Sequence, residues 1–134
     1  MRQNLHAVTL VIPDYDEAIA FYTKVLNFEL LQDLDLGDGK RWVRVAPPGA
    51  KSGSLLLAKA DGDGQAAAIG NQTGGRVGFF LETDDFNRDH SAMLAAGVAF
   101  EEPARHEPYG TVAVWNDPFG NRWDLIEFRD RKNT

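Results

Sequence analysis

One local order of elements occurs twice in this chain: an apolar strand, then an acidic residue, then an amphipathic helix. In the first copy, residues 7–12 are rich in β-branched side chains and read as a strand buried on both faces, or nearly so. Pro13 ends this strand, and Asp14 stands where its carboxylate accepts a hydrogen bond from the first amides of a helix. The apolar stripe of that helix comprises Ala18, Phe21, Tyr22, Val25 and Leu26.

The second copy begins about 70 residues after the first. Residues 77–81 form its strand, Asp85 caps its helix, and Gly97 stands where the helix ends. We therefore predict helices near 14–26 and 85–96, and an α+β fold in which each half has the order β-α-β-β-β. The short strands that follow the helices are expected at 28–31, 41–46 and 54–59, and at 99–101, 111–115 and 122–128.

A length of 134 residues fits one domain built from two halves that share a core. We place the first module at about 5–60 and the second at about 77–129. The connecting loop, at about 60–76, carries little periodic pattern, and a connection of that length is a lid, a binding loop or a plain linker. The sequence leaves the solvated linker and the functional loop equally open.

Composition excludes several classes of function. The 14 Lys and Arg residues against 20 Asp and Glu residues give a net charge of −6, which disfavours a nucleic-acid partner because such a surface needs a basic stripe. The absence of cysteine rules out a thiolate metal site, a disulfide scaffold and a cysteine nucleophile. No apolar run is long enough to cross a membrane, and no apolar signal core is visible. We expect a cytoplasmic protein without a membrane partner.

Three segments resemble the vicinal oxygen chelate superfamily, which includes glyoxalase I, extradiol dioxygenases, fosfomycin-resistance enzymes and bleomycin-resistance proteins. They are residues 8–14, residues 18–28, and the closing turn and strand at 117–127. The resemblance implies two βαβββ modules whose curved mixed sheets form an incomplete barrel around a pocket, commonly completed as a homodimer. It does not fix the function, because the superfamily contains lyases, oxygenases, transferases and plain binders.

The resemblance also implies positions for a metal site. Family enzymes hold a divalent ion with His or Glu side chains from both modules, and counting from the acidic caps places two of these positions at Ala7 and Gly78. The third falls among Leu55, Leu56 and Leu57, and the fourth is Asp124. Because only Asp124 offers a donor, and a lone carboxylate does not hold a divalent ion, we predict no metal and no cofactor.

His6 keeps an alternative open. It precedes Ala7 by one residue, and adjacent strand residues point to opposite faces. His6 would therefore serve as a ligand only if a bulge shifted the register. In that case the chain is a metal-dependent lyase or dioxygenase-like enzyme that uses His6 and Asp124 in a reduced metal site.

Without a metal, a pocket between the two module sheets remains a candidate binding site for a small organic molecule. Trp42 and Arg44 share a face of one strand by two-residue alternation, and either Arg44 or Arg76 could anchor an acidic group. A metal-free binder comes first among the hypotheses, the metal enzyme second, and a dimeric module whose pocket serves only packing third. The candidate ligand-binding residues are Trp42, Arg44, Arg76, Tyr109, Trp115 and Asp124.

Overall fold

The computed structural model describes residues 1–50 and 53–129, and its Cα positions separate into two compact units. The first unit ends at Gly70 and the second begins at Asn71. Among the described residues, no helix has the length and apolar character that crossing a membrane requires.

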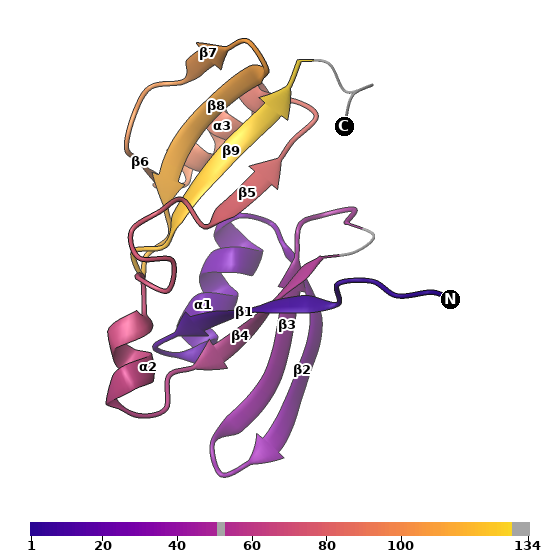
Figure 1. The fold of residues 1–134 in the computed structure, drawn as a ribbon, viewed down its shortest axis with the longest axis vertical. Coiled ribbons are helices and arrows are strands. Elements are labelled where there is room, and N and C mark those ends of the chain that lie inside the picture. The colour runs from indigo at the N-terminus through magenta and orange to yellow at the C-terminus, as the bar shows by residue number, and fades with distance from the viewer. Residues whose placement is uncertain (51–52, 130–134) are drawn as a thin grey trace. The chain divides into compact units, whose positions relative to one another are not determined.

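The first unit is built on a four-stranded mixed sheet with the order β1-β4-β3-β2. β1 runs parallel to β4, and the other pairs are antiparallel, so the first and last strands of the βαβββ order are neighbours in the sheet. In Figure 1 the long strands β2 and β3 curve together away from the rest of the unit. Its elements are β1 (Ala7–Ile12), α1 (Tyr15–Ala20), η1 (Phe21–Val25), β2 (Glu29–Gly37), β3 (Lys40–Ala46), β4 (Ser54–Lys59) and α2 (Asp63–Ala68).

The second unit repeats this topology. Its sheet has the order β5-β9-β8-β6, β5 runs parallel to β9, and the short strand β7 pairs with β8 beside that path. The predicted α+β class, with one curved mixed sheet in each half, is therefore confirmed (Figure 1). The elements are β5 (Phe79–Glu82), α3 (Phe86–Ala95), β6 (Ala99–Phe100), β7 (Arg105–Glu107), β8 (Gly110–Asn116) and β9 (Arg122–Phe128).

Both helix starts form as the sequence predicts. Asp14 Oδ2 accepts a hydrogen bond from the Glu17 amide at 2.9 Å, and Asp85 Oδ1 accepts one from the Arg88 amide at 3.1 Å. The first helix is not α-helical throughout: it widens into the π-helical turn η1 at Phe21. At this change the Thr23 hydroxyl donates to the Ile19 carbonyl at 2.7 Å, a side-chain bond that competes with the regular backbone ladder.

The two cores are rows of buried and half-buried side chains that run across the strands. In the first unit, Leu10, Leu57 and Val43 lie side by side in register and are fully buried. In the second unit, an aromatic row crosses all four strands of the main path. Trp115 stacks on Trp123 with ring centroids 5.0 Å apart, and Phe79 stacks on Trp123 at 4.9 Å. Phe100 pairs with Trp115 and contacts His90 of α3, so the row faces the helix.

Three sequence predictions differ from the structure. β1 is at the edge of its sheet, and Val8 is 47% exposed, so this strand is not buried on both faces. The strand expected at 28–31 continues to Gly37, because it pairs with β3 along a long hairpin. The connection at 60–76 contains the short helix α2, whose first amides follow the positive-φ residue Gly62.

Candidate functional site

The sheet register shows which face carries the metal positions that the resemblance implies. In the first unit, Ala7 pairs with Ser54, and Leu56 pairs with both Thr9 and Arg44, so these side chains share one face. In the second unit, Asp124 pairs with Phe80 and Val114. Since β4 and β9 have the same place in the two sheets, Leu56 is the counterpart of Asp124.

A side chain at Gly78 would meet its neighbour Thr73. A Cβ added at Gly78 would lie 2.4 Å from Thr73 Cγ2, so any larger residue requires Thr73 to move. Ala7 and Leu56 have no donor atoms either, which leaves a donor set that does not fit a divalent cation. In the ranges 1–50 and 53–129, no three His, Asp or Glu side chains are grouped as metal ligands would be.

Asp124 is a partly buried carboxyl group with one unused oxygen. Its Oδ1 is inaccessible to solvent and has no hydrogen-bond partner among the described residues. Burial raises the pKa of Asp124 above its ordinary value of 3.8, and the charges of Arg105 and Arg122 offset only part of that rise. Asp124 is therefore a group that favours its protonated form more than an exposed aspartate does.

This environment gives Asp124 a measurable effect on stability. A carboxyl whose pKa is raised on folding contributes to the stability of the fold in its protonated form. This contribution is fully present below pH 3.8 and is lost as the pH rises through the raised pKa. We expect Asp124→Asn to become progressively more stabilising, relative to the wild type, between acid and neutral pH. Urea unfolding of both proteins across this range, with the exposed Asp61→Asn variant as control, measures the difference. A difference that shrinks with rising pH would contradict this assignment.

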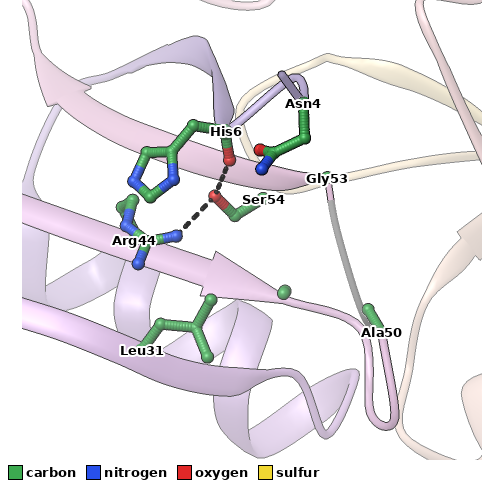
Figure 2. Close-up of a pocket in the computed structure, with 8 residues that line it drawn as sticks. Asn4, His6, Leu31, Arg44, Ala50, Gly53 and Ser54 are labelled. Carbon is green, nitrogen blue, oxygen red and sulfur yellow. Dashed lines mark hydrogen bonds between the residues drawn. The ribbon is translucent and has the colours of Figure 1, made fainter. Parts of the chain in front are cut away.

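The first unit contains a pocket of about 320 Å³ at one end of the Arg44-bearing face (Figure 2). His6 and Asn4 reach it from the segment before β1, Arg44 from β3, and Ser54 from the start of β4. Figure 2 shows the His6 ring beside the Arg44 guanidinium, with Leu31 on the neighbouring strand below. The lining residues are Asn4, His6, Leu31, Arg44, Ala46, Ala50, Gly53 and Ser54.

Arg44 is held in this pocket by neutral partners. Its Nε donates to Gln32 Oε1 at 2.6 Å, and its Nη1 donates to Ser54 Oγ at 2.9 Å. Trp42 Nε1 donates to the same Gln32 oxygen at 2.9 Å, so Trp42 and Arg44 lie on one face as the alternation predicts. Ser54 is itself buried, and its hydroxyl donates to the His6 carbonyl at 2.7 Å.

The remaining candidate residues belong to the second unit and are placed within it. Arg76 is exposed in the segment before β5, and Tyr109 is 49% exposed at the turn between β7 and β8. Trp115 is fully buried in the aromatic row and pairs with Trp123, whereas Asp124 points to the opposite face of the same sheet.

Sequence reasoning missed the residues that position Arg44. Gln32 lies on β2 directly opposite Arg44, after a register shift between Leu30 and Gln32. No pattern in the sequence reports such a shift, so no local signal could have identified Gln32. Ser54 was visible as the first residue of a predicted strand, but its partnership with Arg44 depends on the pairing of β3 with β4.

The chain as a whole is similar to several known proteins. The family model described as Glyoxalase/Bleomycin resistance protein/Dioxygenase superfamily matches residues 4–125. An uncharacterized protein of Shewanella frigidimarina is 48% identical over 133 residues, which is 98% of each chain. The crystal structure of UcmS2 is 30% identical with a TM-score of 0.81, covering 94% of this chain and 98% of that one. TnmS3, an antibiotic binding protein from Streptomyces sp. CB03234, is 29% identical with a TM-score of 0.74, covering 95% and 97%.

Proposed function

The chain belongs to the Glyoxalase/Bleomycin resistance protein/Dioxygenase superfamily, and from that premise we propose that it binds a small organic molecule without the usual four-ligand metal site. The observation that carries this proposal is the set of residues at the implied ligand positions. Ala7, Leu56 and Gly78 lack donor atoms, and Thr73 occupies the space beside Gly78. Asp124 alone does not hold a divalent ion, so the polarising chemistry of the family's enzymes has no support here.

The pocket beside Arg44 in the first unit supports the binding of a small molecule. Ligand sites combine apolar walls with a few fixed polar groups, and pockets for small molecules begin at about 300 Å³. The pocket beside Arg44 has about 320 Å³, apolar walls from Leu31, Ala46 and Ala50, and an immobilised guanidinium. The likeness to TnmS3, which is described as an antibiotic binding protein, favours binding over conversion.

Two measurements on one sample test this proposal. Protein purified without chelator or added metal is analysed for its metal content, and its thermal unfolding is then screened against a library of small aromatic and heterocyclic molecules. We expect a substoichiometric metal content and a ligand that raises the unfolding temperature. A ligand at 100 times its Kd should stabilise the fold by about 2.7 kcal/mol.

The metal-enzyme alternative predicts a different result. One equivalent of zinc, nickel, manganese or iron in the wild type, lost in Asp124→Ala and in His6→Ala, would overturn the metal-free proposal. Conversion of a stabilising ligand to a product, followed by mass spectrometry, would overturn the assignment as a plain binder. The exposed variant Asp61→Asn is the matched control for loss of a carboxylate.

We also propose that the protein is a homodimer. β2 forms an edge of its sheet, and edge strands are usually covered or paired. Its apolar side chains support a self-association surface, because Leu30, Leu34 and Leu36 are each more than 40% exposed. Sedimentation that shows only monomer over a range of micromolar concentrations would count against the dimer.

A further inference from the structure

We propose that the pocket at Arg44 is a carboxylate-binding subsite, in which Gln32 is the positioning residue for the guanidinium. This inference rests on the proposed binding function and specifies its ligand class: a small organic acid whose apolar body lies against Leu31 and Ala46.

Arg44 has more donors than its protein partners use. A guanidinium carries five N–H groups in a rigid fork, and the described residues accept from Nε and Nη1 only. The side chain is half-buried and lines the pocket. The remaining donors, on Nη2 and Nη1, are the type that binds a carboxylate in a bidentate manner.

No carboxylate neutralises Arg44 among the described residues. The arginines at 41, 88, 105 and 122 each form an ion pair with Asp or Glu at 2.7–2.9 Å. Arg44 is bound instead by an amide oxygen and a hydroxyl oxygen. The nearby carboxylate of Glu29 accepts from the Gly49 amide at 3.4 Å, and it forms no ion pair with Arg44. The guanidinium of Arg44 is thus held by two hydrogen bonds, and its positive charge is available to an anionic ligand.

Gln32 and Ser54 together set the orientation of the guanidinium. Gln32 Oε1 accepts from both Arg44 Nε and Trp42 Nε1, so one side-chain oxygen connects the two residues. Ser54 donates its own proton to the His6 carbonyl and therefore presents a lone pair to Arg44. An arginine that is held before the ligand arrives loses less conformational entropy on binding, which raises affinity.

The remaining walls define the ligand. His6 and Asn4 add polar groups to the lining, and Leu31, Ala46 and Ala50 add apolar ones. Figure 2 shows His6 beside Arg44 and Leu31 on the neighbouring strand. A carboxylate attached to a small apolar or aromatic body matches this division. An uncharged ligand of the same shape leaves the donors of Arg44 without a charged partner, so it should bind more weakly.

The test compares 2-naphthoate with 2-naphthamide, which share a ring system and differ in charge. Binding is measured by NMR titration of the wild type and of the variants Arg44→Gln, Arg44→Lys, Gln32→Glu and Arg129→Gln. The Arg44 Nε–H and Trp42 indole N–H signals report on the site directly. Arg129 is exposed, so Arg129→Gln controls for the loss of one positive charge.

We expect the wild type to prefer naphthoate, and Arg44→Gln to weaken naphthoate binding by about 10- to 100-fold with little change for naphthamide. Arg44→Lys should keep only part of the wild-type affinity for naphthoate, because the lysine ammonium group cannot bind a carboxylate in the bidentate manner of a guanidinium. Gln32→Glu should also weaken naphthoate binding while the fold remains stable, since the new carboxylate neutralises Arg44 in place. That loss, together with a shifted Arg44 Nε–H signal, would show that residue 32 contacts the guanidinium in solution and that the uncompensated charge of Arg44 binds the ligand.

Failure of this inference differs from failure of the proposed function. Equal affinity for the two compounds, unchanged in Arg44→Gln and Gln32→Glu, would overturn the carboxylate subsite and leave the protein a binder. A neutral ligand found by the thermal screen, with no binding of naphthoate, would do the same. If neither naphthalene compound nor any library member binds, both proposals are overturned.

Discussion

Replacing Trp115 with alanine is expected to lower the free energy of unfolding by about 3–5 kcal/mol. Trp115 is fully buried and stacks on Trp123 at the centre of the aromatic row of the second unit. Truncation removes that stacking and leaves a cavity lined by Trp123 and Phe100, which the sheet cannot close without moving strands. Urea unfolding monitored by circular dichroism measures the change.

The same variant decides between two interpretations of Trp115. The sequence suggested a ligand contact, whereas its place in the aromatic row predicts a core residue. Trp115→Phe is the matched control, because it keeps an aromatic ring in the row and should cost clearly less than alanine. If Trp115→Ala left stability nearly unchanged and weakened ligand binding instead, the core assignment would be wrong.

Replacing Asp117 with alanine should be the second costly change, at about 3 kcal/mol or more. The buried Asp117 carboxylate organises the turn between β8 and β9. It accepts from the Phe119 and Asn121 amides, each at 2.9 Å, and from Asn121 Nδ2 at 2.7 Å. Alanine would leave the buried donors of Asn121 unsatisfied, and each such group costs about 1–3 kcal/mol. Thermal and urea unfolding measure the loss.

Asp117→Asn separates the geometry of the turn from the charge of the carboxylate. The asparagine oxygen can still accept from the two backbone amides, but its NH2 group faces the Asn121 side chain, so an intermediate loss is expected. Equal stability of Asp117→Ala and the wild type would contradict the assigned role. The segment 117–121 carried part of the family resemblance. The hydrogen bonds of Asp117 give this segment a structural role, because they close the hairpin between β8 and β9 in the second unit.

Much of the fold could be predicted because its signals are local. The two acidic caps, the helical stripes and the β-branched strands each depend on residues a few positions apart, and β1, β4 and β9 have the predicted bounds. The prediction was weaker where neighbours in space decide the outcome. The exposure of Val8 follows from the edge position of β1, and the extension of β2 follows from its pairing with β3.

For the candidate site, too, some features could be predicted from the sequence and others could not. At the positions that the resemblance implies, residue identity determined that Ala7, Gly78 and the leucines at 55, 56 and 57 offer no metal-ligand atoms, since no folding can supply a donor to a side chain without one. Alternation alone placed Trp42 and Arg44 on one face. Neither required knowledge of which strands are neighbours.

Only the tertiary structure decided what surrounds Arg44. A one-residue slip in strand pairing exchanges the two faces of a strand, and β2 contains such a shift between Leu30 and Gln32. The shift places the Gln32 amide oxygen beside the guanidinium, and the parallel pairing of β1 with β4 sets Ser54 beside His6. The Gln32–Arg44 contact forms only when β2 and β3 pair in this shifted register, and the Ser54–His6 contact, between residues 48 positions apart, forms only when β1 pairs with β4.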